Sequence, residues 1–128
     1  MTPYVGALED LTLKGTSFRK VLFTAEHCQL VLMCLQAGED IGVEIHDDVD
    51  QFFRIESGEA RFIFEGMGER LAHEGDAVVV PAKTRHNVIN ASETAPLRLY
   101  TIYSPPNHPD GTLHETKADA AVAEKAHA

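Results

Sequence analysis

A short stretch between Gly38 and Gly58 concentrates side chains that can bind a metal ion. Glu44 and His46 are two positions apart, so on a β-strand both side chains point to the same face. The polar segment after His46 can reverse the chain, and Gln51 then opens a second apolar run. If the two runs pair antiparallel, Gln51 returns beside Glu44 and His46. This spacing predicts that three oxygen and nitrogen donors converge from one bent hairpin.

A second patch, residues 75–90, supplies a fourth candidate donor, His86, on a separate predicted strand. We expect one divalent metal ion inside a small barrel, held by Glu44, His46, Gln51 and His86. Imidazole and carboxylate donors suit zinc, iron, manganese, nickel or cobalt, so these residues do not select one metal. The alternatives are structural. Glu44 and His46 could be an exposed pair at a strand end, and Gln51 could only hydrogen-bond across the site.

Two apolar residues follow Gln51 on the same face of its predicted strand. Phe53 and Ile55 are predicted to line the floor of the metal pocket, although plain core packing would give the same pattern. Arg54 alternates out of this face, and Arg98 could face either way. The sequence therefore names no arginine that could clamp an anionic substrate.

The rest of the sequence predicts short strands that are separated by turns. Strands recur at intervals of roughly eight to twelve residues, which is typical of an all-β sandwich or barrel. They are predicted over residues 18–24, 29–36, 42–46, 51–55, 59–64, 69–73, 77–80, 85–90 and 97–103. The run 29–36 is apolar on both faces and needs cover on both sides. Either a partner subunit or the N-terminal arm could supply the outer cover.

The chain has 128 residues and is predicted to form one domain, a β-barrel over residues 18–104. We expect residues 1–17 to form an N-terminal arm with one short strand at most, and residues 105–128 to form a C-terminal extension. The alanine-rich end of this extension is predicted to be a short surface helix or a disordered tail. His108 and His114 lie in its polar part, and their folding over the barrel mouth is the less favoured alternative.

Charge and apolar patterning exclude several classes of protein. The net charge of −9 argues against non-specific binding of nucleic acid or of anionic membranes. The N-terminus lacks the basic region of a signal peptide, and the longest apolar run, Leu30–Leu35, is far shorter than the ~20 residues of a membrane span. Cys28 and Cys34 would lie roughly 20 Å apart on one strand, too far for a disulfide. Read as buried residues, they fit a reducing compartment, and a cytoplasmic location is expected.

The first metal-binding stretch resembles the first sequence motif of the cupin superfamily, G-x5-H-x-H-x3,4-E-x6-G. The matching positions, in order, are Gly38, Glu44, His46, Gln51 and Gly58. Glu44 replaces the usual first histidine, and Gln51 replaces the usual glutamate. Both replacements can still bind a metal through oxygen.

The second patch resembles the second cupin motif, G-x5-P-x-G-x2-H-x3-N. Gly75, Pro81, His86 and Asn90 match it, and Lys83 stands where glycine is usual. The resemblance implies a double-stranded β-helix, also called a jelly roll, which is often dimeric. It also implies that the three donors of the first motif and the histidine of the second hold a metal.

The resemblance leaves two classes of function open. The donor set is similar to the zinc set of type I phosphomannose isomerases, with acid and amide exchanged in position. It also contains the two-histidine-one-carboxylate set of iron(II) oxygenases. The favoured function is a small metal-dependent enzyme that acts on an oxygen-rich small molecule by isomerisation or oxygen activation. The alternative is a non-catalytic cupin that binds a small ligand or serves as a sensor.

Overall fold

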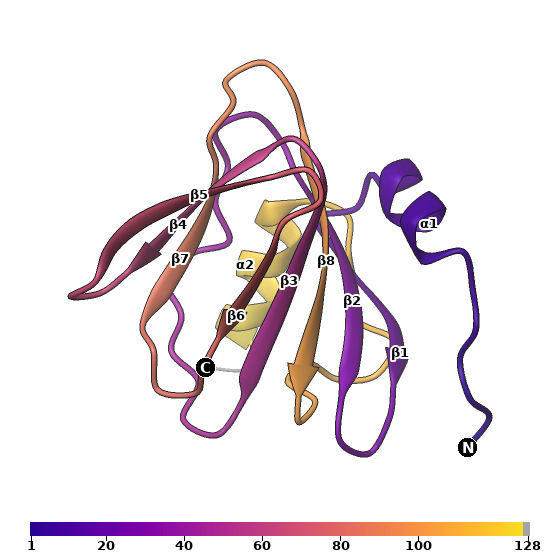
Figure 1. Ribbon diagram of the computed structural model, residues 1–128. Coiled ribbons are helices and arrows are strands. Elements are labelled where there is room, and N and C mark those ends of the chain that lie inside the picture. Colours follow the sequence, from indigo (N-terminus) through magenta and orange to yellow (C-terminus); the bar gives the residue numbers. More distant parts are fainter. Residues whose placement is uncertain (127–128) are drawn as a thin grey trace.

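The computed structural model describes residues 1–126, which form two antiparallel sheets and two short helices (Figure 1). The elements are α1 (Leu8–Lys14), β1 (Arg19–Thr24), β2 (Gln29–Leu35), β3 (Asp50–Ser57), β4 (Glu59–Phe64), β5 (Gly68–His73), β6 (Ala77–Val80), β7 (His86–Asn90), β8 (Leu97–Ser104), β9 (Leu113–His114) and α2 (Lys117–Ala126). One sheet has the strand order β6-β3-β8-β2-β1-β9, and the other has the order β5-β4-β7. The predicted all-β architecture is confirmed.

The core lies between the inner faces of the two sheets. Side chains alternate along β3, so Gln51, Phe53 and Ile55 are buried while the residues between them are partly exposed. Phe53 meets Phe62 of β4 edge to face, with ring centroids 5.1 Å apart. This contact joins the two sheets, and Gln51 is buried on the same face of β3, two residues before Phe53.

One predicted strand is wrong. Residues 42–46 do not form a strand, because Gly42 has a φ of 108°, a conformation that interrupts an extended segment. The segment meets β7 through one isolated bridge, which pairs Glu44 with His86, and through a hydrogen bond from the N–H of Gly42 to the Asn87 side chain. The predicted hairpin with residues 51–55 is also wrong, since β3 pairs with β6 and β8 instead.

The N-terminal arm holds a helix rather than a strand. Glu9 and Asp10 lie in the first turn of α1 and Lys14 in the last, which complements the helix dipole. Lys14 also forms an ion pair with Asp10 at 2.9 Å across one turn. The hydrophobic periodicity of such a short segment is too weak to reveal a helix.

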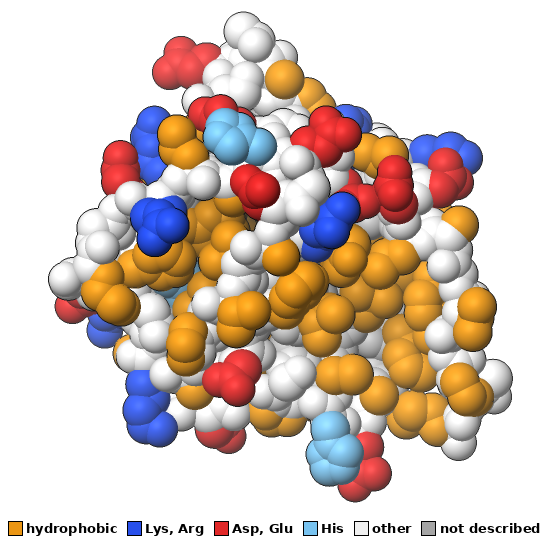
Figure 2. Space-filling view, in the orientation of Figure 1, with side chains coloured by type: hydrophobic (Ala, Val, Ile, Leu, Met, Phe, Trp, Pro, Cys, Tyr) orange, Lys and Arg blue, Asp and Glu red, His pale blue; other side chains and the backbone are white. Residues whose placement is uncertain are grey.

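The outer face of the larger sheet is covered only in part by the N-terminal segment. Leu32 and Cys34 are buried there, and the backbone N–H of Cys34 donates to the Ser17 carbonyl at 3.1 Å. Apolar side chains remain exposed in a broad patch over the strands that face the viewer in Figure 2. Both alternatives for the outer cover of residues 29–36 therefore stay open, with the arm supplying part of it.

The described part of the C-terminal extension contains more structure than predicted. Helix α2 confirms the helical alternative as far as Ala126, and residues 127–128 lie outside the described residues. Strand β9, which was not predicted, pairs with β1. No helix within residues 1–126 has the length and apolar character needed to cross a membrane.

Both cysteines are free, as predicted, but only Cys34 is buried. The prediction that Cys28 is also buried is wrong. Cys28 lies outside β2, in the turn after β1, where its side chain is exposed.

Candidate metal centre

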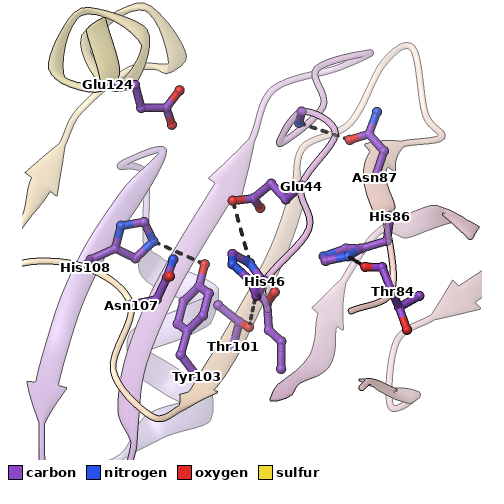
Figure 3. Close-up of polar contacts among 12 residues, drawn as sticks. Glu44, His46, Thr84, His86, Asn87, Thr101, Tyr103, Asn107, His108 and Glu124 are labelled. Carbon is purple, nitrogen blue, oxygen red and sulfur yellow. Dashed lines mark hydrogen bonds and ion pairs between the residues drawn. The ribbon is translucent and has the colours of Figure 1, made fainter. Parts of the chain in front are cut away.

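Three of the four predicted donors lie together near the start of β7 (Figure 3). One ligand atom from each of Glu44, His46 and His86 lies within 4.8 Å of the others. Bonds from nitrogen or oxygen ligands to zinc are about 2.0–2.2 Å long, so ligands around one ion are about 3–4 Å apart. Small side-chain adjustments would therefore bring all three into contact with one cation.

The backbone fixes the relative positions of Glu44 and His86. The N–H of Glu44 donates to the carbonyl of His86 at 2.8 Å, and the N–H of His86 donates back at 2.9 Å. Two residues joined by such a reciprocal pair lie directly opposite each other, and their side chains share one face. The two donors converge although they are far apart in sequence.

The loop before β7 holds His46 in place. The N–H of Lys83 donates to the His46 carbonyl at 2.7 Å. Lys83 has a φ of 71°, in the left-handed region where glycine carries no steric penalty. This conformation gives a physical reason for the glycine that the cupin motif has at this position.

Three buried polar atoms of the predicted donor residues have no hydrogen-bond partner among the described residues. They are Nε2 of His46, Nε2 of His86 and Oε1 of Gln51. A buried polar atom without a partner costs free energy, and most such atoms in folded proteins are satisfied. All three are atoms that can donate an electron pair to a cation, so the residues fit a divalent metal ion.

Neighbouring groups orient these atoms as ligands. Nδ1 of His86 lies 2.9 Å from the Thr84 carbonyl oxygen, which can only accept, so Nδ1 carries the proton. Nε2 is therefore the ring nitrogen of His86 that can offer a lone pair to a metal ion, as in other metal-binding histidines.

A similar argument fixes the amide of Gln51. The hydroxyl of Thr101 donates to the Phe52 carbonyl at 2.8 Å, so it can only accept from the Gln51 amide nitrogen at 3.0 Å. The amide nitrogen therefore faces Thr101, and Oε1 is the atom left free. The geometry supports ligation by Gln51, which remains a prediction.

The two predicted pocket-lining residues are both fully buried. The ring of Phe53 packs edge-on against the ring of His86, with centroids 6.3 Å apart. Ile55 belongs to the hydrophobic core. The floor role of Phe53 and Ile55 remains a prediction, with Phe53 the closer of the two to a donor.

Tyr103 and His108 border the centre and were not predicted as site residues. The Tyr103 ring meets the His46 ring edge-on at 5.9 Å, and its hydroxyl lies 3.3 Å from Nε2 of His108. Burial, and then the negative charge of Glu44, raise the pKa of Tyr103, so the phenol stays protonated. The alternation that buries Gln51 and Thr101 could have pointed to Tyr103, which is paired with Gln51 in register.

His108 reaches the barrel because Gln29 binds the segment that carries it. The side-chain oxygen of Gln29 accepts from the N–H groups of Asn107 and His108, and its nitrogen donates to the His108 carbonyl at 2.8 Å. Burial, and then the neighbouring Arg19, lower the pKa of His108 to about 3. The C-terminal extension thus brings His108 against Tyr103, and folding of this segment over the barrel mouth stays a prediction.

Comparisons with known proteins identify the family of the chain. The family model described as "Cupin domain" matches residues 31–103. The chain is 50% identical to the uncharacterized protein YrkC of Bacillus subtilis, with 95% of this chain and 68% of that protein covered. It is 47% identical to the uncharacterized protein L612 of Acanthamoeba polyphaga mimivirus, over 86% of this chain and 70% of that one.

A solved structure provides the same result for the fold. The crystal structure of BH2720 from Bacillus halodurans superposes with a TM-score of 0.90 at 43% identity, and the match covers 94% of this chain and 95% of that one. The two motifs, the two facing sheets and these matches lead to one conclusion. The chain belongs to the cupin family, and its barrel is a single-domain double-stranded β-helix.

Proposed function

We propose that this cupin binds one divalent metal ion through Glu44, His46, Gln51 and His86 and acts as an enzyme on an oxygen-rich small molecule. The observation that supports metal binding best is the set of three buried ligand atoms on His46, Gln51 and His86 that have no hydrogen-bond partner within the described residues. No pairing within the described residues satisfies them, and a cation would satisfy all three together.

The donor set determines the charge of the centre. Glu44 is the one anionic donor of the set, since both imidazoles bind as neutral rings and Gln51 is an amide. A divalent ion held there would polarise a substrate oxygen as a Lewis acid. Protonated Tyr103 is placed to donate a hydrogen bond at the edge of the centre, and His86 is held in its ligand orientation by Thr84.

Metal binding is tested on chelator-treated protein titrated with Co²⁺, followed by visible absorption and calorimetry. We expect His86→Ala to weaken Co²⁺ binding by more than the ~10–100-fold that loss of an outer-sphere partner costs. His73→Ala is the matched control, because His73 is an exposed histidine on β5. Equal Co²⁺ affinity in both variants would contradict the proposal.

Gln51 is tested separately by Gln51→Glu. A second carboxylate beside Glu44 repels it in the metal-free protein and attracts the cation in the metal-bound protein. The variant should therefore unfold at a lower temperature than wild type with chelator and bind Co²⁺ more tightly. Unchanged affinity would show that the side chain at position 51 does not reach the ion.

Catalysis is distinguished from simple binding by a substrate screen of hydroxy acids and sugars. Turnover that is lost in folded His86→Ala supports an enzyme. Ligand binding that survives chelation supports the non-catalytic alternative instead.

We also propose a cytoplasmic location, because the exposed free thiol of Cys28 fits a reducing compartment.

A further inference from the structure

A cavity with a mostly apolar lining and a few polar side chains lies between the barrel and α2. It has a volume of about 260 Å³, and its polar walls are Arg19, His108, His114 and Glu124. These residues come from β1, from the segment after β8, from β9 and from α2, so the cavity exists only because the C-terminal extension folds back. None of them belongs to the proposed metal-binding set.

The guanidinium of Arg19 is a buried charge that is poorly paired. Arg19 is only 1% exposed, and its Nε has no hydrogen-bond partner within residues 1–126. Among those residues, Nη1 lies a long 3.4 Å from Nδ1 of His114, and the guanidinium also faces the Tyr103 hydroxyl. Five N–H groups are available on a guanidinium, so most of its donor capacity is unused.

Glu124 is an incomplete counter-ion for Arg19. Its Oε1 lies 3.9 Å from Nη1, beyond hydrogen-bonding distance, and its side chain is 70% exposed. An exposed carboxylate is largely solvated and compensates a buried cation weakly. An anion bound inside the cavity would therefore compensate the buried positive charge of Arg19.

We propose that this cavity binds the carboxylate group of a small organic acid, with the Arg19 guanidinium as its anchor. The assignment names the substrate class for the proposed function and in that respect rests on it. Binding of the carboxylate itself does not require the metal ion. A planar carboxylate can accept two parallel N–H bonds from a guanidinium, which is the strongest pairing that arginine makes.

The charge balance favours a monoanion over a phosphate. Arg19 is the one permanently positive group on the cavity walls. Burial, and then Arg19, lower the pKa values of both His108 and His114, so both imidazoles are neutral near pH 7. The single positive charge of Arg19 can balance one negative charge and not two, and the carboxylate of Glu124 at the rim adds repulsion against a dianion.

The cavity and the metal centre share a wall. His108 lines the cavity and contacts the Tyr103 hydroxyl at 3.3 Å, and Tyr103 packs against His46. Figure 3 shows Glu124, His108, Tyr103, His46 and Glu44 in one region of the molecule. An acid anchored at Arg19 thus has its remaining atoms close to the side of the barrel where the metal-binding set lies.

The test uses the full metal-free chain, labelled with ¹⁵N and titrated with sodium propionate while the Arg19 Nε–H signal is followed by NMR. Propionamide and inorganic phosphate are titrated in parallel as the neutral and dianionic probes. We expect a saturable shift with propionate and none with propionamide. Equal responses to propionate and propionamide, or tighter binding of phosphate than of propionate, would overturn the carboxylate assignment.

Two variants identify the residues. Arg19→Gln should weaken propionate binding about tenfold or more, followed on the His108 signals, whereas Lys20→Gln, an exposed neighbour on β1, should not. Glu124→Gln is the second variant, because its exposed position leaves folding unaffected even if Arg19→Gln fails to fold. It should tighten propionate binding by roughly threefold, since it removes a competing negative charge.

Affinity for propionate that is unchanged or weaker in Glu124→Gln would overturn the proposal. The Co²⁺ affinity of the same variants is measured independently. Intact Co²⁺ binding without propionate binding rejects the cavity alone. Propionate binding without Co²⁺ binding rejects only the metal site.

Discussion

At the scale of single residues, the candidate metal centre depends on neighbours that are not ligands. The Thr84 carbonyl and the Thr101 hydroxyl determine which atoms of His86 and Gln51 remain free. A carbonyl oxygen can only accept a hydrogen bond. The Thr101 hydroxyl already donates to the Phe52 carbonyl, so it too can only accept from Gln51. The ligand atoms are therefore oriented before any ion is bound.

His108 makes stability depend on pH. Its pKa is lowered from 6.5 to about 3 in the folded chain, first by burial. Below pH 6.5, His108 becomes protonated in the unfolded chain but stays neutral in the folded chain. The free energy of unfolding therefore decreases as the pH falls from 6.5 to about 3.

We expect His108→Asn to lose less stability than wild type between pH 7 and pH 5. Urea unfolding at the two pH values measures this difference. His27→Asn is the control, since His27 is an exposed histidine whose removal should leave the wild-type difference in place. A pH-dependent loss of the same size in His108→Asn and wild type would contradict the assignment.

At the scale of elements, a polar network connects α2 to the segment that carries Glu44. Asp40 accepts from Lys117 Nζ on α2 and from the Asn87 amide at 2.8 Å, and the Asn87 oxygen accepts from the N–H of Gly42 at 3.0 Å. Burial by itself would raise the pKa of Asp40. The hydrogen bonds from Lys117 and Asn87 outweigh it, and the pKa is lowered. The carboxylate form of Asp40 is thus the one that the fold stabilises.

Loss of this connection should loosen α2. We expect Lys117→Met to reduce the free energy of unfolding by about 0.5–1 kcal/mol, as a partly exposed ion pair does, and to speed amide exchange in α2. Lys125→Met changes an exposed lysine on the same helix and serves as the control. Hydrogen exchange followed by mass spectrometry compares the two. Equal exchange rates in both variants would show that the Lys117–Asp40 pair does not hold the helix.

At the scale of the whole molecule, the outer face of the larger sheet exposes a broad apolar patch (Figure 2). Phe52 of β3 and Tyr100 of β8 lie side by side on it, with ring centroids 6.3 Å apart, and Val79 of β6 is 65% exposed. Exposed apolar patches of this kind mark interaction surfaces. We propose that a second copy of the chain covers this face, because one patch can meet itself across a two-fold axis.

The proposed homodimer is tested by sedimentation equilibrium. Phe52→Glu should convert dimers to monomers, because a carboxylate buried in an apolar interface is strongly unfavourable. Met67→Glu is the matched control, since Met67 is 68% exposed in the turn between β4 and β5, away from this face. A monomeric wild-type chain, or a dimer that survives Phe52→Glu, would reject the face as the interface.

The sequence predicts the barrel and the meeting of Glu44, His46 and His86, because both motifs and the strand periodicity are local signals. It does not predict the route by which they meet. Gly42 interrupts the expected strand, and the partner of Glu44 is His86 on β7 rather than a residue of β3. Such a pairing depends on how the sheets face each other, which local periodicity does not encode.

The surroundings of Arg19 are a second feature that the sequence does not predict. In the sequence it begins a strand, and nothing nearby indicates that it is buried. It shares the buried face of β1 with the core residue Val21, and its hydrogen-bond partner His114 on β9 lies 95 positions further along the chain. Short, polar elements with weak periodicity, such as β9 and α1, leave little signal in a single sequence.

The reciprocal hydrogen bonds between the main chains of Glu44 and His86 have a consequence for how this barrel can change over time. The spacing of these two positions is a property of the backbone and not of their side chains. A different side chain at position 44 would therefore occupy the same place beside His86 and change which cation is preferred. Single substitutions at position 44 would thus change metal selectivity while the backbone of the barrel stays the same.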